Sequence, residues 1–114
     1  MQAEEKVLSA DTEGKIKRFK FALSLARRAG KALCGTPLVC DAVRGGGVEF
    51  VLVSKYASEN SKKRVLNCAT HYKTKILYTE LTPEALGAAV GKASLACIGI
   101  TDKNLAFNIE RNLY

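Results

Sequence analysis

Residues 48–54, with the sequence Val-Glu-Phe-Val-Leu-Val-Ser, form a nearly continuous apolar run that is rich in β-branched and aromatic side chains. Such a run is typical of a strand that is buried on both faces, and a sheet containing it needs a helical layer on each side. Further strand-like runs occupy residues 31–35, 75–79 and 95–101. Segments with helical spacing of apolar residues separate these runs and flank them. The alternation therefore predicts an α/β sandwich with helices on both sides of a four-stranded sheet.

The predicted helices begin and end at recognisable signals. They are expected at about residues 15–29, 37–44, 83–90 and 102–112, with a further helix starting after Ser58. The candidate N-caps are Thr36, Ser58, Thr82 and Asp102, and the candidate stops are Gly30 and the triple glycine 45–47. The predicted sheet core contains Phe50, Leu52, Ile76, Leu77, Ile98 and Ile100. The apolar stripe of the first helix is Ile16, Phe19, Leu23 and Ala26, and that of the third helix is Val65, Cys68, Ala69 and Tyr72.

The length of 114 residues is that of a single domain, which we place at residues 15–114. Residues 1–14 are polar, lack periodicity and hold four of the eleven acidic residues, so we predict a flexible N-terminal extension. No apolar run approaches the ~20 residues that a membrane span needs. The polar start does not resemble a signal peptide, which predicts a cytoplasmic protein. The net charge of +7 favours a polyanionic partner such as nucleic acid or a ribosome.

The residues that carry enzyme chemistry do not form a recognisable constellation. Four cysteines lie in or beside apolar segments without a Cys-x-x-Cys pair, at Cys34, Cys40, Cys68 and Cys97. The single histidine, His71, lies off the apolar face of its helix and is predicted to be a surface residue. These spacings predict reduced core thiols and no metal site. No nucleophile–base pair or carboxylate dyad is visible, so we predict neither a cofactor nor enzymatic activity.

The first predicted helix carries charge of one sign. From Lys15 to Lys31 the chain has seven basic residues and no acidic one. On a helical wheel, a sector of roughly 100° opposite the apolar stripe holds Lys17, Lys20, Arg27, Arg28 and Lys31. A solvated helix face usually mixes charges to gain pairs between successive turns. A face of one sign therefore favours contact with phosphates over a merely solvated surface.

A glycine corner follows the first short strand. Gly35 is followed by Thr36, a candidate N-cap, and by Pro37, which suits the first turn of a helix. A helix N-terminus after a glycine turn offers free N–H groups and the positive end of the helix dipole. The corner is therefore a candidate phosphate site, and its structural alternative is a simple joint between strand and helix.

Several separated motifs resemble a known family. Residues 25–31 with Gly35, residues 57–63 and residues 89–92 are similar to the bacterial YlxQ-type ribosomal-protein-like family. That family lies within the superfamily of the archaeal ribosomal protein L7Ae, whose members bind kink-turn RNA. The resemblance covers about residues 15–111 and implies a three-layer α/β/α sandwich with a four-stranded mixed sheet. It also implies RNA docking through the corner and the loop after the fourth helix, by Gly35, Thr36, Arg44, Val90, Gly91 and Lys92.

The corner departs from the kink-turn pattern at the residues that read bases. Kink-turn readers of this superfamily tend to show Gly-x-Asn-Glu-x-x-Lys, whereas residues 35–41 here have Pro37, Leu38 and Asp41 at the three polar positions. The leucine cannot accept a hydrogen bond from a guanine edge, and the aspartate repels phosphate. We therefore predict RNA binding with weak preference for kink-turns.

The combined prediction is a non-catalytic RNA-binding protein whose partner is structured RNA, with the ribosome as one candidate source. The alternative is a protein–protein interaction module of the translation apparatus that has lost RNA reading. An enzyme is the third class, and a pocket in which His71 converges with an acidic residue or a cysteine would favour it. The sequence does not predict the oligomeric state.

Overall fold

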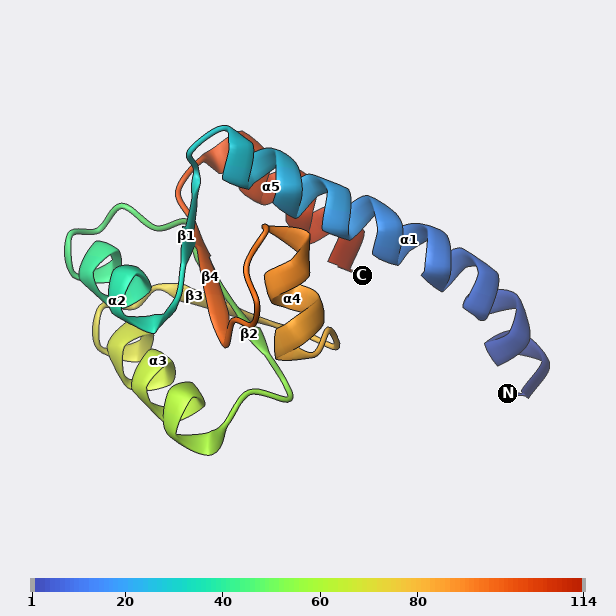
Figure 1. Cartoon of the computed structure of the whole chain (residues 1–114), viewed down its shortest axis with the longest axis horizontal. Helices are drawn as coiled ribbons and strands as arrows, with labels where there is room; N and C mark the ends of the chain where they lie inside the picture. Colours follow the sequence, from blue (N-terminus) through green and yellow to red (C-terminus); the bar gives the residue numbers. More distant parts are fainter. Residues whose placement is uncertain (1, 114) are drawn as a thin grey trace.

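The computed structural model describes residues 2–113 of the chain, with side chains from residue 14 onward. Five helices alternate with four strands in the predicted order (Figure 1). The helices are α1 (Gln2–Arg28), α2 (Thr36–Arg44), α3 (Glu59–His71), α4 (Pro83–Ala89) and α5 (Lys103–Leu113). The strands are β1 (Ala32–Cys34), β2 (Phe50–Ser54), β3 (Lys75–Thr79) and β4 (Cys97–Ile100).

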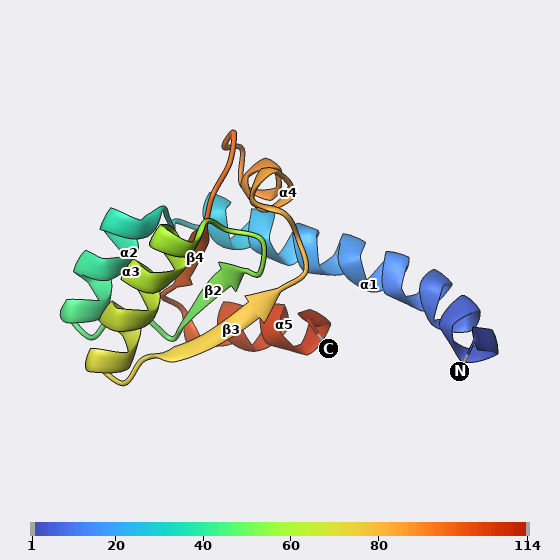
Figure 2. The same cartoon turned by 90° about the horizontal axis from the view of Figure 1, so that it is seen from below.

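The strands form one mixed sheet in the order β1-β4-β2-β3. β2 and β3 are parallel, whereas β4 is antiparallel to both of its neighbours, β1 and β2. Helices α2 and α3 cover one face of this sheet, and α1, α4 and α5 cover the other (Figures 1 and 2). The architecture is therefore the predicted three-layer α/β/α sandwich.

Alternate residues of the central strands build a core on each side of the sheet. Phe50 and Leu52 point toward α1, α4 and α5, where they join Ile98 and Ile100 of β4. Val51 and Val53 point the other way, toward smaller side chains of α2 and α3. The predicted core is confirmed except at Ile76, which is half-buried at the edge strand β3.

Two apolar residues predicted to face the core are exposed instead. Ile16 is 37% exposed because it lies over a hollow beside the end of β3 and not over the sheet. Tyr72 is 44% exposed because α3 ends at His71, so that the tyrosine follows the helix. Its ring contacts the ring of His71 edge-on, with centroids 4.7 Å apart.

The N-terminal helix is longer than predicted. α1 begins at Gln2 and not near Lys15. Residues 2–13 contain no proline or glycine, and eight of these twelve residues are Ala, Glu, Gln, Lys or Leu, which favour helix by intrinsic propensity even without an apolar period. Met1 and the side chains of residues 2–13 lie outside the described part of the chain, so the flexibility of residues 1–14 stays a prediction.

Three of the four predicted N-caps are confirmed. The side chains of Ser58, Thr82 and Asp102 each accept a hydrogen bond from the backbone N–H of the residue three positions later in the chain. The distances are 3.2, 3.1 and 2.9 Å respectively. The prediction for Thr36 is wrong, because Gly35 takes the cap position of α2. Thr36 is the first residue of the helix, and its buried hydroxyl lies 3.8 Å from the Cys97 sulfur.

The cysteines pack as apolar residues. All four are free thiols, and Cys40 and Cys97 are buried. Burial raises the pKa of the Cys97 thiol, and that of the Cys40 thiol, to about 11. Both therefore stay protonated at neutral pH, which is the state in which a thiol neither binds metal nor acts as a nucleophile.

Candidate nucleic-acid interface

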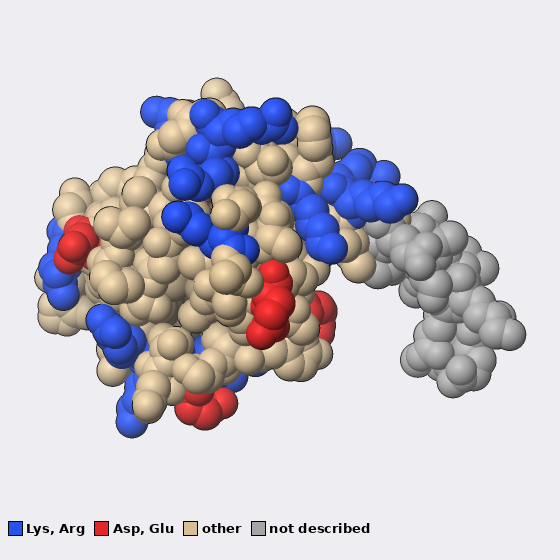
Figure 3. Space-filling model, viewed as in Figure 1, with Lys and Arg blue, Asp and Glu red and all other residues tan. Residues whose placement is uncertain are grey.

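The C-terminal half of α1 presents its positive charges to solvent. Phe19, Leu23 and Ala26 are fully or almost fully buried, which turns the opposite side of the helix outward. We call the predicted basic set the α1 basic face: Lys17, Lys20, Arg27 and Arg28, with Lys31 just beyond the helix. All of these are exposed except Lys20, which is half-buried. In Figure 3 Lys and Arg side chains gather along α1 and toward α4, others lie over α2 and α3, and an acidic patch borders the first group.

The β1–α2 corner (residues 35–38) presents mainly backbone and two exposed apolar side chains, Pro37 and Leu38. Gly35 has φ 99°, a conformation that glycine adopts without strain, and its N–H donates to the Cys97 carbonyl at 3.3 Å. Pro37 lies in the first turn of α2, as predicted. The side chain of Leu38 is 55% exposed there, whereas Thr36 is buried. The corner can therefore bring backbone close to a phosphate but offers no polar side chain to a base.

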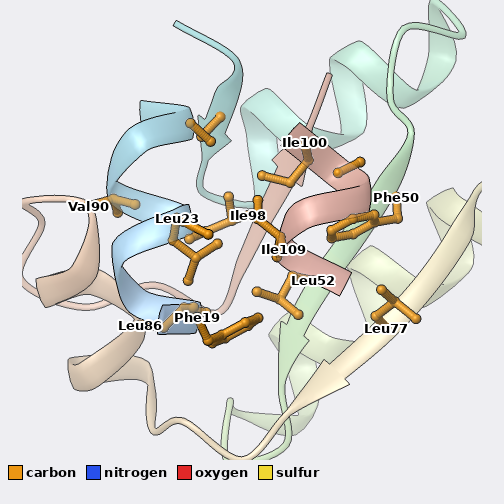
Figure 4. Close-up of a cluster of buried hydrophobic side chains, with 14 residues drawn as sticks. Phe19, Leu23, Phe50, Leu52, Leu77, Leu86, Val90, Ile98, Ile100 and Ile109 are labelled. Atoms are coloured by element: carbon orange, nitrogen blue, oxygen red, sulfur yellow. The ribbon is translucent and has the colours of Figure 1, made fainter. Parts of the chain in front are cut away.

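The α4–β4 loop (residues 90–96) is anchored at its start by the core. The side chain of Val90 is buried beside Leu23 of α1 (Figure 4). Gly91 follows with φ 77°, and the N–H of Lys92 donates to the Gly87 carbonyl at 2.8 Å. Of the predicted loop residues, Gly91 and Lys92 are exposed, so Val90 acts by holding the loop on α1 and not by presenting its side chain.

Gly87 shapes this loop and was missed by the sequence analysis. A Cβ atom at this position would lie 2.8 Å from the Ser94 nitrogen and 2.9 Å from the Lys92 carbonyl oxygen. These are backbone atoms, which cannot move aside as a flexible side chain would. The available signal was a glycine inside a helical pattern, which often marks a close backbone approach.

The fold brings the corner and the end of the loop together. The loop enters β4 at Cys97, whose carbonyl accepts the hydrogen bond from Gly35. The start of the same loop packs on α1 through Val90. The α4–β4 loop thus contacts α1 at its start and the β1–α2 corner at its end, although it follows both segments by more than 50 residues in the chain.

Two predicted residues lie away from the corner. The Lys31 carbonyl accepts a hydrogen bond from the Thr101 N–H at 3.0 Å, which places Lys31 at the far end of β4, about 14 Å of strand from Cys97. Arg44 is the last residue of α2, about 12 Å along the helix from its start. Its guanidinium pairs with the Asp41 carboxylate at 2.9 Å. Lys31 therefore extends the α1 basic face, whereas Arg44 is separate from both groups.

The metal-ligating side chains of the described residues are not clustered. No group of three or more His, Cys, Asp and Glu side chains among them could hold a metal ion. His71 is exposed on α3, as predicted, and its described neighbour is Tyr72. None of the described helices is long and apolar enough to cross a membrane.

Comparison with known proteins places the chain among ribosomal-protein-like sequences. Residues 17–109 match the ribosomal protein L7Ae/L30e/S12e/Gadd45 family. The chain is 33% identical over 85 residues to the RNA-binding protein YlxQ of Bacillus subtilis, an alignment that covers 74% of this chain and 83% of that protein. It is also 33% identical over 95 residues to the RNA-binding protein YlxQ of Enterococcus faecium, with 82% and 89% covered.

Solved structures agree with this relationship. A Bacillus halodurans protein of unknown function superposes with a TM-score of 0.76 at 28% identity, covering 84% of this chain and 96% of that one. The 15.5-kDa RNA-binding protein of Giardia lamblia shares the fold, with a TM-score of 0.67 at 13% identity over 90% of this chain and 85% of that one. The sequence match, the YlxQ relatives and the shared sandwich lead to one conclusion: the chain belongs to the ribosomal protein L7Ae/L30e/S12e/Gadd45 family, as a YlxQ-type member.

Proposed function

We propose that this protein is a non-catalytic RNA-binding protein that docks structured RNA on the α1 basic face, the α4–β4 loop and the β1–α2 corner. The observation that carries the proposal is that the α4–β4 loop packs on α1 at its start and is hydrogen-bonded to the β1–α2 corner at its end, so that one helix with charge of a single sign and two glycine turns belong to neighbouring segments. The names of the YlxQ relatives, both called RNA-binding proteins, support the same function.

Each segment contributes a different kind of contact. Lysine and arginine side chains of the α1 basic face neutralise phosphates, which supplies affinity without sequence preference. Gly35 and Gly91 both have positive φ and carry no side chain, so that an RNA backbone can approach the protein backbone at these turns. Among the predicted loop residues, Lys92 is the one with a charged side chain, and that side chain is exposed.

We propose that kink-turn preference is weak. Base reading in the corner needs a polar side chain, and the exposed side chains there, Pro37 and Leu38, are both apolar. Asp41 is less repulsive to phosphate than its formal charge indicates, because Arg44 pairs with it at 2.9 Å. Phosphate contacts at the corner are therefore compatible with its sequence, whereas selective base contacts are not.

The ribosome in the cytoplasm is the source of structured RNA that we propose to examine first, because the family includes ribosomal proteins. A protein–protein module is the second candidate, and the exposed Leu38 at the corner favours it. Capture of partners from lysate with and without ribonuclease separates the two. Partners that are lost on ribonuclease treatment support RNA binding, whereas partners that persist favour the protein module.

The direct test is binding of a labelled ribosomal RNA hairpin at several salt concentrations. The double variant Arg28→Ala with Lys31→Ala should bind more weakly than wild type and flatten the log–log salt slope by about 1.4 to 1.8. The matched control is Lys63→Ala with Arg64→Ala, which removes the same charge from exposed positions of α3 on the other side of the sheet. Equal losses in both variants would reject the proposed surface and leave only a net-charge effect.

A further inference from the structure

A second surface with nucleic-acid chemistry lies between α1 and α5. The two helices lie side by side and run in opposite directions (Figures 1 and 2). A hollow of about 330 Å³ opens between them, lined by Lys17, Arg18 and Phe21 from α1 and by Asn108 and Asn112 from α5. Its volume is in the lower range of ligand pockets, which is about 300 to 1,000 Å³. Neither the corner nor the α4–β4 loop contributes a residue to it.

Phe21 is the unusual residue of this hollow. It is 59% exposed, although a phenylalanine ring gains free energy by burial. Phe19 and Leu23, on either side of it in sequence, are buried in the core. The ring therefore contributes to the outer surface of α1 and not to the packing of the sandwich.

Hydrogen bonds between α1 and α5 fix the positions of polar groups near the Phe21 ring. The Arg18 Nε donates to the Asn112 side-chain oxygen at 3.4 Å, and the Asn112 amide donates to the Asn108 carbonyl at 2.9 Å. This chain of hydrogen bonds links α1 to α5 and positions the guanidinium beside the hollow. Lys17 adds a second cation, and no acidic residue lines the space.

We propose that this hollow binds an unpaired nucleotide of RNA, with its base stacked on Phe21 and its phosphate on Lys17 and Arg18. The inference rests on the RNA-binding function proposed above and adds a second contact site to it. Aromatic rings beside cations are how proteins bind single-stranded nucleic acid, and side-chain amides can pair with polar base edges. A base inside a duplex is already stacked and cannot use the ring.

A protein partner fits the lining less well. Grooves that dock helices or peptides are lined by several apolar side chains, whereas this hollow has one aromatic residue among four polar ones. Two cations without a carboxylate complement a phosphate chain. Because Lys17 belongs to both the hollow and the α1 basic face, the structure favours an RNA strand that leaves a duplex held by that face and enters the adjoining hollow.

The test compares two labelled probes by fluorescence anisotropy, an oligouridine of about eight nucleotides and a blunt RNA duplex of about 16 base pairs. Phe21→Ala should lower oligouridine affinity by about 5- to 150-fold and change duplex affinity by less than about twofold. Phe21→Trp keeps a stacking surface and should retain oligouridine binding. The matched control is Phe107→Ala, since Phe107 is a 69% exposed phenylalanine on α5 that does not line the hollow.

Four other results would contradict the proposed nucleotide site, and each has a different meaning. Unchanged oligouridine affinity in Phe21→Ala, or the same loss in Phe107→Ala, means that the hollow is not the nucleotide site. A wild-type dimer that dissociates in Phe21→Ala during sedimentation means that the ring serves self-association. Wild-type binding to the duplex but not to oligouridine rejects this site and leaves the proposed function intact. Failure to bind either probe rejects both.

Discussion

The helices on the two sides of β1 differ in what they can offer to RNA. From Lys15 onward, α1 and the turn after it carry seven basic residues and no acidic one. α2 carries one cation, Arg44, and its charge is paired with Asp41 on the same helix. The exposed side chains in the first turn of α2 are those of Pro37 and Leu38, and both are apolar. One helix therefore supplies charge, and the other supplies a backbone corner without a polar reader.

This separation has a consequence for binding. Charge on α1 contributes affinity for any phosphate chain, because phosphate contacts carry little sequence information. Selectivity in a kink-turn reader comes from base contacts, and the exposed first-turn side chains of α2 are apolar. We therefore expect strong dependence on salt and weak dependence on RNA sequence.

The largest expected effect is the salt dependence that α1 imposes. Three or four phosphate contacts give a log–log slope of roughly −2 to −4, so affinity for a structured RNA should fall about 16- to 250-fold between 50 and 200 mM salt. A titration series of anisotropy curves measures this slope. An affinity that does not change with salt would contradict the whole role of the α1 basic face.

The second effect is a gain of selectivity at the corner. The double change Leu38→Glu with Asp41→Lys introduces a base acceptor and a cation at the two positions where kink-turn readers carry them. A good base contact is worth about 1–3 kcal/mol, so kink-turn affinity should rise about 5- to 150-fold relative to a duplex of equal length. Pro37 need not change, because the first turn of a helix leaves its N–H groups unpaired.

The single change Asp41→Lys serves as the control for this experiment, because it adds the cation without the acceptor and should raise affinity for both RNAs. A wild-type protein that already prefers the kink-turn a hundredfold would show that the corner reads RNA by another route.

The third effect concerns the α4–β4 loop, which lies against α1 at its start and against the β1–α2 corner at its end. Gly87→Ala places a methyl group within 2.9 Å of the loop backbone at Lys92 and Ser94, so the loop must shift. Overpacking of this kind costs about 1–3 kcal/mol, and thermal unfolding should show it as a lowered Tm. Gly47→Ala is the matched control, because nothing lies within 4 Å of the added Cβ and φ is not positive there. Equal Tm values for the two variants would show that the loop yields without cost.

The smallest effect should come from Arg44. It lies at the far end of α2, and the exposed pair that it makes with Asp41 screens the carboxylate only weakly, so Arg44→Ala should lower RNA affinity by less than about twofold. Arg28→Ala, which removes one unit of the same charge from the α1 basic face, should cost more. A larger loss for Arg44→Ala would extend the interface along α2 and erase the distinction between the two helices.

Local signals in the sequence were sufficient for most of the elements. Ser58, Thr82 and Asp102 cap helices because a cap is made within three residues of chain. The boundaries of β3 match the prediction of residues 75–79. The α1 start was missed because periodicity reports packing, whereas the first half of this helix is favoured by intrinsic propensity.

The candidate interface was less predictable because its geometry is not local. Thr36 looked like a cap, but its hydroxyl faces a cysteine 61 residues later in the chain. Val90 matched a family motif, yet its side chain belongs to the core beside Leu23. Burial at such positions depends on which distant segment packs there, and no short sequence pattern encodes that.

The sequence by itself determined the order of helices and strands, the burial of residues 51–53 on both faces and the single sign of charge on α1, because each follows from side chains close together in the chain. Only the tertiary structure decided which charges and turns are neighbours. β4 pairs with β1 and so sets Gly35 against Cys97, while α5 packs on α1 and so forms the hollow beside Phe21. These contacts arise from burial of apolar surface between segments that are distant in the sequence. The free energy of that burial depends on both partners, so it cannot be inferred from the sequence of one segment alone.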